Sequence, residues 1–428
     1  DLHSFPTRRS SDLHIDVLVD GVGSTGVLVQ SVGGGGGNGG LNVSGNVSLG
    51  KGYTASIGIG GNGGAGANAG AVTLTSNGMV RVDGREALDA NATLTDEQRN
   101  RLADRESANG ILAQSIGGGG GNGGMNITGA FARAGSPLAV GVGGSGAGGG
   151  HAGAVTVNRG LEEASLLVTR GNAANGLTAQ SIGGGGGNAG INIVVDGTIP
   201  KEEDKKKQMK VVIGGAGGTP GHGEVVTVDH VGNIVTEGRQ SEGILAQSIG
   251  GGGGNANVNF GAGVNRNTTG FDLVIGGGPG DGGNGGVVNV DHNGIIATVG
   301  NDSAAIFAQS VGGGGGNAEA DDSQVEDMLA APEIALDAFS DEKRSLNITI
   351  GREGGTGGTG GDVTVTSAGT LATLGDRAVG IRAQSVGNAG GVSSTTSFEW
   401  SGDNDAKVQV GLPIWRSEER RVGKECRS

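Results

Sequence analysis

The sequence is almost without cysteine, since its 428 residues hold a single one, Cys426. One thiol cannot form a disulfide framework, and the histidines show no metal-ligand spacing to one another. Aromatic residues are also scarce, at 2% of the chain. Phe, Tyr and Trp normally supply much of the buried area of a compact core. These shortages exclude a disulfide-stapled domain and argue against a thick globular core.

Positive charge and long apolar runs are also in short supply. Lys and Arg total 29 against 43 Asp and Glu, so the formal net charge is -14. An acidic chain repels nucleic-acid phosphates and anionic membrane surfaces, and we expect neither as a partner. No apolar run approaches the roughly 18 residues of a membrane-spanning helix, so no direct membrane insertion is expected. No secretory signal peptide is recognisable.

The two ends of the chain differ from everything between them. Residues 1–13 read DLHSFPTRRSSDL and residues 416–428 read RSEERRVGKECRS. Both resemble translated sequencing-adapter read-through, so we set them aside as foreign segments. We expect the true protein to continue beyond both. The body, residues 14–415, is then free of cysteine, which suits export through an oxidising compartment.

Glycine is what the chain has in excess, with 98 residues, and it lies in a repeated phrase that reads GILAQSIGGGGGN in its fullest form. Six copies are marked by a Gln-Ser pair, at spacings of 84, 66, 67, 62 and 75 residues. Repetition of a unit of this size is typical of a stacked architecture rather than a globule. The pairs begin at Gln30, Gln114, Gln180, Gln247, Gln309 and Gln384.

Each unit contains about five short β-branched runs separated by glycines, which predicts an all-β chain folded as a parallel β-helix or β-solenoid with glycine-rich turns. At about 20–25 residues per coil, one unit would make three rungs. Roughly 18 rungs of about 4.8 Å would then form a rod about 85 Å long. In the Gln-Ser strand, the first and third positions are apolar in every copy, so we expect them to face the core. The Gln is expected to form an amide ladder or to fix a corner.

The glycine tracts have a local period near three, as in GGTGGTGGD from Gly354. Glycine permits sharp turns, so turns and loops on the solenoid are the preferred interpretation. The same period fits an extended threefold helix like polyproline II, in which glycine allows close packing of neighbours. A disordered tract is the third alternative.

Three insertions interrupt the repeat, at residues 85–106, 200–210 and 318–344. The first contains a capping-box-like start at Thr95 followed by polar residues, which predicts a short helix. The second is a run of charges, and the third is acidic and partly apolar. We expect short helical or disordered surface loops at these places, with or without a role in binding.

No motif with the context that catalysis or cofactor binding needs is present. Gly45–Lys51 has the spacing of a phosphate loop, but Gly52 stands where Ser or Thr would bind magnesium. The glycine repeats lack the aspartate of calcium-binding nonapeptides, because Val287 occupies its place. We therefore predict no catalytic, cofactor-binding or metal residue and no cofactor. Isolated calcium sites stay open at Asp281, Asp291 and Asp362.

Two histidines occupy equivalent places in two repeats. His230 and His292 each follow an aspartate in the same block. Recurrence in register predicts turn residues rather than catalytic bases. A cluster of carboxylates with Arg or Lys, formed across rungs, is what a polysaccharide lyase or hydrolase would need, and the sequence leaves that alternative open.

The Gln-Ser phrase, with flanking VTV and IGG blocks over about residues 20–400, resembles the glycine-rich passenger repeats of bacterial autotransporters. The resemblance implies a non-catalytic structural or adhesive fragment exposed at the bacterial cell surface and tethered to the protein's own C-terminal outer-membrane barrel. A host-surface or matrix protein or a glycan is then the expected partner. The alternatives are a β-helical carbohydrate-active enzyme and a glycine-rich repetitive binding protein. An ice-binding face, one form of the latter, would need a regular Thr-x-Thr ladder.

Overall fold

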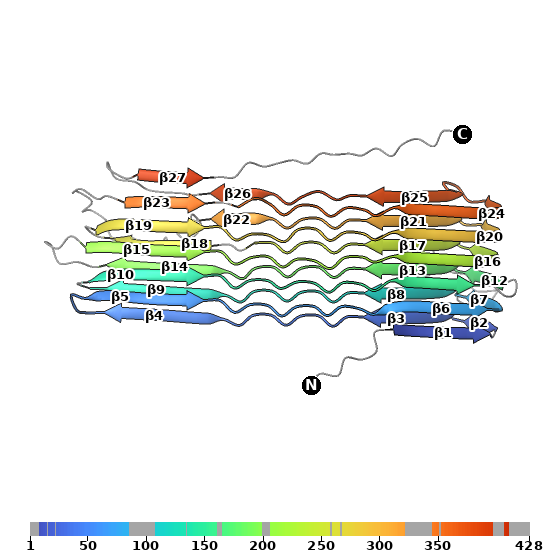
Figure 1. The fold of residues 1–428 in the computed structure, drawn as a ribbon, viewed down its shortest axis with the longest axis horizontal. Helices are drawn as coiled ribbons and strands as arrows, with labels where there is room; N and C mark the ends of the chain where they lie inside the picture. Colours follow the sequence, from blue (N-terminus) through green and yellow to red (C-terminus); the bar gives the residue numbers. More distant parts are fainter. Residues whose placement is uncertain are drawn as a thin grey trace, which may run out of the picture.

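The computed structural model describes residues 8–14, 16–21, 23–84, 108–133, 135–160, 165–198, 206–256, 259–265, 268–321, 345–350, 352–396 and 406–410. These residues form β-strands and extended segments, without a helix, and the strands pair in parallel. Figure 1 shows coils stacked one above another, with strands gathered at the left and right ends of the coils and extended segments running between them. The fold is therefore all-β and compatible with a β-solenoid.

One repeat of the sequence makes one coil of this stack. A coil follows β3 (Val27–Val32), a first glycine tract, β4 (Asn42–Ser48), β5 (Tyr53–Ile59), a second tract, β6 (Ala71–Asn77) and β7 (Met79–Asp83). It then reaches β8 (Ile111–Ile116), which lies directly against β3 with Gln114 opposite Gln30. The prediction of three rungs per unit is therefore wrong. Six coils at about 4.8 Å form a stack only about 25 Å high along the stacking direction, in place of an 85 Å rod.

The later coils repeat this path. Two sheets lie at the end of the coils shown at the right of Figure 1. One has the strand order β1-β6-β11-β16-β12-β7-β2, in which β16 also pairs with β20 and β20 pairs with β24. The other has the order β25-β21-β17-β13-β8-β3. Their remaining strands are β1 (Arg8–His14), β2 (Val17–Asp20), β11 (Val155–Arg159), β12 (Ser165–Arg170), β13 (Leu177–Ile182), β16 (Val226–Glu237), β17 (Ile244–Ile249), β20 (Val288–Thr298), β21 (Ile306–Val311), β24 (Val363–Thr373) and β25 (Ile381–Val386).

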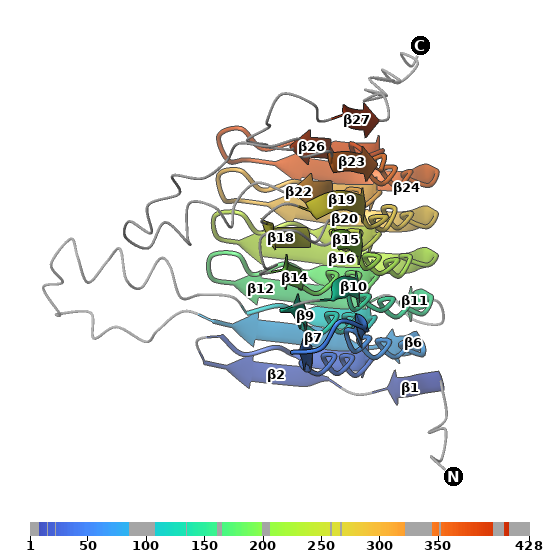
Figure 2. The ribbon, with the colours of Figure 1, turned by 90° about the vertical axis from the view of Figure 1, so that its left-hand side faces the viewer.

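Three sheets lie toward the other end, in the orders β18-β14-β9-β4, β27-β23-β19-β15-β10-β5 and β22-β26. Their remaining strands are β9 (Asn126–Ala132), β10 (Ser136–Val142), β14 (Asn192–Thr198), β15 (Lys206–Ile213), β18 (Asn259–Asn265), β19 (Thr268–Ile275), β22 (Ala318–Asp321), β23 (Ser345–Ile350), β26 (Ser393–Thr396) and β27 (Ala406–Val410). Figure 2 shows the coils one above another from β2 to β24.

The insertions begin and end differently from the prediction. Residues 206–210 belong to β15, which pairs with β10 and β19, and residues 318–321 form β22. Only 200–205 of the second insertion and 322–344 of the third lie outside the described residues, as does the whole of 85–106 with its predicted helix.

Part of the adapter-like segment takes the place of a strand. β1 pairs with β6, with Arg9 opposite Val72 and Ser11 opposite Leu74. The later coils have valine at both of these register positions, as in Val155 and Val157. The foreign origin of residues 1–13 stays a prediction, and the polar residues at two apolar register positions agree with it.

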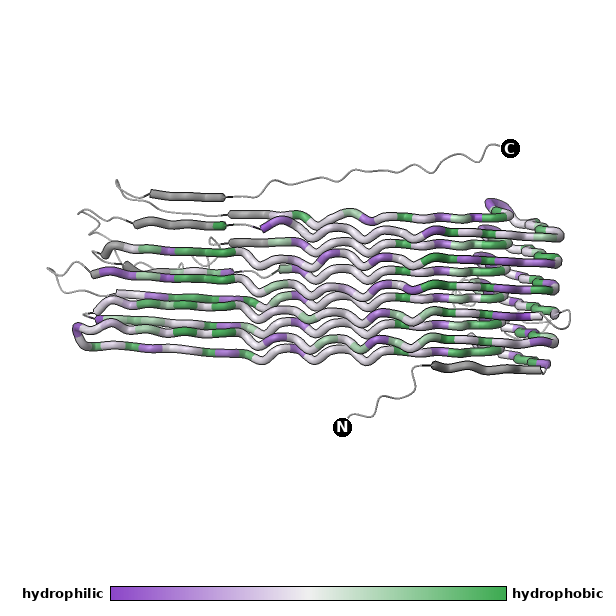
Figure 3. Tube along the Cα trace, in the orientation of Figure 1, coloured by the Kyte–Doolittle hydropathy of each residue, from purple (hydrophilic) through white to green (hydrophobic). Residues whose placement is uncertain are grey.

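The apolar core is concentrated at one end of the stack. Alternate residues of β6, β11, β16 and β20 are buried against the inward residues of the Gln-Ser strands, in a single cluster that includes Leu74, Ile111, Leu167, Ile234 and Ile306. A much smaller cluster of Ala and Val residues lies between β9, β14, β10, β15 and β19 at the other end. The tube in Figure 3 shows the paler, glycine-rich segments between these two ends.

The glycine tracts pack side by side as extended chains, in two layers. A zigzag of hydrogen bonds crosses between the layers: the Gly64 amide donates to Gly37 O at 2.6 Å, and the Gly121 amide donates to Gly64 O at 2.9 Å. The same alternation continues through Ala147, Gly187, Gly218, Gly254, Gly280, Gly316, Gly355 and Gly391. None of the described tract glycines has a φ in the left-handed region. The preferred prediction of turns and loops is therefore wrong, and the polyproline II-like alternative describes the tracts.

The period of three follows from this packing. In an interior coil, a Cβ on Gly120 would overlap the second tract at Ala147 O, and a Cβ on Gly121 would overlap the previous coil at Gly37 O. A Cβ on Gly119 would meet only Gly185 O, at an ordinary 4.0 Å. Two positions of each triplet are thus closed to side chains, and the third faces outward.

Candidate functional site: two outward faces and two buried polar clusters

The Gln-Ser strands alternate as predicted. Ile111, Leu177 and Ile244 at the first position and Ala113, Ala179 and Ala246 at the third are fully buried. The second position is outward, as at Leu28, which is 54% exposed, although Thr178 at this position of the third coil is covered and only 3% exposed. The Gln side chains form the predicted amide ladder, in which each Nε2 donates to the Oε1 of the next coil at 2.6–3.2 Å, from Gln30 to Gln384.

The serine beside each Gln joins the two layers, a role that the sequence reasoning missed. Ser181 Oγ accepts a hydrogen bond from the Glu224 amide at 2.8 Å and donates to Gly153 O of the previous coil at 3.0 Å. Ser115, Ser248 and Ser310 make the same pair of contacts. The recurrence of Ser after Gln at an inward position was the available signal.

A third ladder lies on the outward positions of the first tract. Asn38 Oδ1 accepts from the Asn122 amide at 2.9 Å, and the pattern repeats through Asn188, Asn255 and Asn317 to the Val392 amide. Each of these side chains satisfies a backbone amide of the next coil. Only Nδ2 of each amide is left to face solvent, so the row is polar without being charged.

The outward positions of the Gln-Ser strands and first tracts together make one broad surface, which we call the neutral face. In the described part of coils one to five it carries neither acidic nor basic side chains. Its rows are Leu28, Leu112, Thr178, Leu245 and Phe307; the five Gln residues; Val32, Ile116, Ile182, Ile249 and Val311; Gly35, Gly119, Gly185, Gly252 and Gly314; the five Asn residues; and Leu41, Met125 and Ile191.

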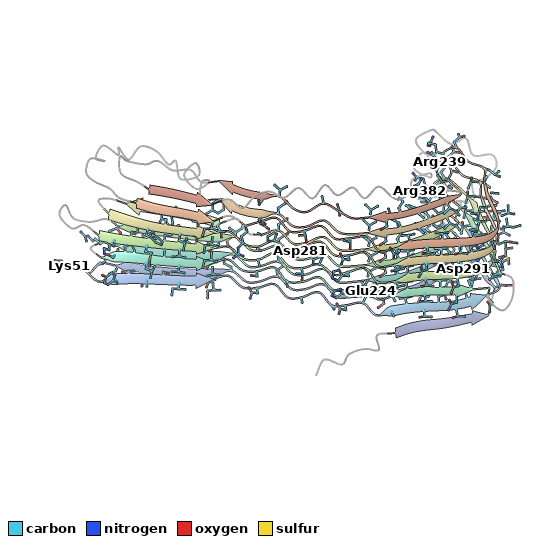
Figure 4. All side chains as sticks on the ribbon, turned by 45° about the horizontal axis from the view of Figure 1, so that its top comes forward. Lys51, Glu224, Arg239, Asp281, Asp291 and Arg382 are labelled. Carbon is cyan, nitrogen blue, oxygen red and sulfur yellow. The ribbon has the colours of Figure 1, made fainter. Side chains whose placement is uncertain are left out.

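The outward positions of the second tracts and of the strands that follow them carry charge, and we call this surface the charged face. Asp281, Asp291, Glu353 and Asp362 are exposed on it. Figure 4 places Asp281 over the middle of the stack and Asp291 over its strand end. Asp281 Oδ1 accepts from the amide and the hydroxyl of Thr356, both at 2.8 Å. Of the described residues, no three His, Cys, Asp or Glu converge as a metal site, so nothing strengthens the open calcium alternative at Asp281, Asp291 or Asp362.

Threonine rows on this face are irregular. The register aligns Thr73, Thr156 and Thr227 in one row, but the next coil places Asn289 there. The neighbouring row runs Thr75, Asn158, Asp229, Asp291 and Thr366. The array that an ice-binding face would need is interrupted in both rows.

His230 and His292 lie inside strands, which corrects the prediction of turn residues. Each is fully or almost fully buried in a column with Ser76, Arg159 and Ser367, where the chain rounds a corner. The corner follows two residues later, at Gly232, whose φ of +132° favours glycine. The two rings stack at 5.1 Å, with Nδ1 to Nδ1 at 3.0 Å.

This column is basic, and burial dominates its electrostatics. Burial lowers the pKa of His230 to about 3, helped by His292 and Arg159, and burial also lowers the pKa of His292. Burial lowers the pKa of Arg159 to about 10. The Arg159 guanidinium donates to Gly78 O at 2.8 Å, Leu166 O at 3.2 Å and Ser76 Oγ at 3.1 Å. Neutral stacked imidazoles and a carbonyl-bound guanidinium inside the core fix the corner.

A second buried cluster lies between the sheets at the other end. Lys210 Nζ contacts Asp272 Oδ2 at 3.2 Å, and Asp196 lies nearby, fully buried. Burial raises the pKa of Asp196 to about 6, and the positive charge of Lys210 only partly offsets it. Neither carboxylate oxygen of Asp196 makes a hydrogen bond of good geometry with the described protein. Two carboxylates and a lysine from two coils do converge, but inside the stack rather than in an open groove.

The phosphate-loop-like spacing has no matching structure. Gly45 lies within β4, and Lys51 is exposed in the connection from β4 to β5, at the far end of the stack in Figure 4. A phosphate loop instead leads from a strand into a helix, whose N-terminus holds the anion.

Within the described residues, no helix is long and apolar enough to span a bilayer. A scan against protein-family models found no match, and searches of curated proteins and of solved structures found none either.

Proposed function

We propose that the chain is a non-catalytic structural or adhesive element of an extracellular surface protein, with its coils closed into a β-solenoid. The observation that carries this proposal is the hydrogen-bonded zigzag from Gly37 to Gly391, which ties all six coils together through both layers. With the Gln and Asn ladders it makes a stiff plate that holds its side chains in fixed rows. A plate with two broad faces suits display and contact better than turnover of a small substrate.

The resemblance of the repeats to autotransporter passengers supports a place at the bacterial cell surface. In this reading the partner is a host-surface or matrix protein or a glycan. The acidic charged face and the uncharged neutral face each offer a broad surface to such a partner.

Adhesion is tested with beads coated with the purified chain, applied to epithelial cell layers, matrix proteins and immobilised glycans. We expect retention of the folded chain on at least one of these surfaces, above beads coated with heat-unfolded chain. Equal retention of both kinds of bead on every surface would contradict the adhesive part. The structural part predicts that fragments containing the stacked tracts survive limited proteolysis.

A carbohydrate-active enzyme is the second candidate, and the cluster of Asp196, Lys210 and Asp272 is the observation that favours it. A raised carboxyl pKa near a second carboxylate is what a general acid needs. Burial of Asp196 and Lys210 between the sheets ranks this candidate lower, because a glycan has no direct contact with either side chain. Glycan cleavage by the chain that is lost in Asp196→Asn would reverse the ranking.

A further inference from the structure

The neutral face stands out in a chain of net charge -14. Five coils present uncharged side chains there, while exposed carboxylates lie on the charged face. Its large apolar side chains are most exposed in the first coil, with Val32 at 63% and Leu41 at 65%, and are partly exposed in the interior coils, as at Ile116 and Ile182. A contiguous exposed surface of this kind is typical of an interaction site.

The face has a relief that repeats from coil to coil. The row of Val32, Ile116, Ile182, Ile249 and Val311 forms an apolar ridge. The next outward row consists of glycines, so it forms a furrow between that ridge and the Asn row. Outward rows of an extended threefold tract lie about 9 Å apart, so the ridge and the Asn row that border the furrow are about 18 Å apart, which leaves room for one row of aliphatic side chains between them.

Ridge and furrow are adjacent, parallel and equally long, so the face is complementary to itself. A two-fold axis along the stacking direction, midway between them, would place the ridge of each copy over the furrow of the other. It would also bring the Gln row of one copy near the Asn row of its partner. Self-complementarity about a two-fold axis is what an isologous dimer requires.

The area is sufficient for a stable dimer. A six-residue strand at about 3.3 Å per residue and a nine-residue tract at about 3.1 Å span about 48 Å. Five coils at about 4.8 Å add a width of about 24 Å, or about 1,100 Å² per copy. A standard interface buries about 800 Å² per partner.

We propose that a second copy of this chain binds the neutral face, ridge against furrow. Charge supports this occupant, because two strongly acidic copies repel one another over their other surfaces and can approach over coils one to five, whose own outward rows on this face are uncharged. A neutral polysaccharide is disfavoured, since Phe307 is the only aromatic side chain in these rows and Arg382 lies over its ring at 5.1 Å.

The test is sedimentation equilibrium of the full chain between about 1 and 100 µM, with reductant present so that Cys426 forms no cross-link. We expect a monomer–dimer equilibrium that strengthens with salt, as the repulsion between acidic copies is screened. Gly185→Lys should weaken dimerisation at least tenfold, because it places a charge in the furrow. A Cβ at Gly185 has 3.7 Å to its nearest neighbour, so the coil accommodates the substitution.

Thr219→Lys is the matched control, since it adds the same charge to an exposed row of the charged face. Gly119→Lys, one coil below, is the second furrow variant, and circular dichroism checks that each variant keeps its β-structure. A chain that stays monomeric at 100 µM would overturn the proposal. So would equal weakening by Thr219→Lys and the furrow variants, or a dimer that neither furrow variant affects. Retention of a monomeric chain on cellulose or chitin, abolished by Gly185→Lys, would assign the face to a polysaccharide instead.

Discussion

Replacing Gly187 with alanine probes the packing of the glycine tracts at one atom. A Cβ on Gly187 would overlap Gly121 O and lie 2.6 Å from its carbonyl carbon, both in the coil below. Backbone cannot rotate away as a flexible side chain can. The Gly187 amide donates to Ala147 O at 2.9 Å, and its carbonyl accepts from the Gly218 amide at 2.7 Å. Any movement that relieves the overlap therefore stretches two links of the zigzag.

The magnitude follows from those contacts. Overpacking typically costs about 1–3 kcal/mol, and each weakened hydrogen bond adds about 1 kcal/mol. We expect Gly187→Ala to lower the free energy of unfolding by about 3–5 kcal/mol. Gly185→Ala is the control, two residues away, because its Cβ would meet only Gly252 O at 3.7 Å. It should be neutral or stabilise by up to about 1 kcal/mol, since alanine restricts the unfolded chain.

Urea denaturation followed by circular dichroism gives the two midpoints. Hydrogen exchange of the peptide covering residues 183–191 reports the same effect locally, which matters because a stack of repeats can unfold in parts. Equal midpoints and equal exchange for the two variants would show that the tracts do not pack as two hydrogen-bonded layers, and the explanation of their period of three would fail.

Three further outcomes are expected. The pKa of buried His230 is about 3 and that of the unfolded residue is near 6.5, so the unfolded state binds more protons between these two pH values. Lowering the pH from 7 to 4.5 should therefore reduce the free energy of unfolding by about 2–3 kcal/mol, and by less in His230→Gln. Urea titrations at both pH values measure this difference. Asp196 acts in the opposite sense, because its pKa in the folded chain, about 6, is higher than the ordinary 3.8. Asp196→Asn should therefore raise the free energy of unfolding by up to about 3 kcal/mol at pH 8 and hardly at pH 4. An equal effect at both pH values would contradict the argument that burial raises this pKa. Gln247→Ala removes two hydrogen bonds of the Gln ladder, of 2.7 and 3.1 Å, and should lower the free energy of unfolding by about 1–2 kcal/mol in thermal or urea unfolding. Gln30→Ala, at the end of the ladder, removes one such bond and should have roughly half this effect.

Features that depend on residues next to one another in the chain could be predicted. Side chains alternate across a strand, so the inward Ile111 and Ala113 and the outward Leu112 could be assigned without knowing the fold. A Gln at the same position in every unit predicted its ladder, because stacked copies place identical amides in register. The strands were likewise evident from their β-branched runs, of which coils one and two form five strands each, whereas coils three to five join the last two runs into one strand.

The buried polar clusters could not be predicted in this way. Asp229-His230 and Asp291-His292 have the composition of turns, yet register with Arg159 makes them part of a strand inside the core. Asp196, Lys210 and Asp272 come from three strands of two facing sheets, and the charged run at 200–210 concealed the fact that Lys210 belongs to one of them. Contacts between sheets leave no local signal in the sequence.

The sequence by itself determined the number of repeats, the register between them and the face to which the residues of the Gln-Ser strands point. Only the tertiary structure decided how wide a coil is and where its charges lie. The physical reason is the glycine tract. Glycine is equally able to turn or to continue straight, so local sequence does not fix the path of a tract such as 117–124. Hydrogen bonds to tracts of its own and neighbouring coils, such as that from the Gly121 amide to Gly64 O, determine that path. Because those bonds hold the tracts straight, one repeat becomes one wide coil, and the outward third positions of the first tracts become part of the neutral face.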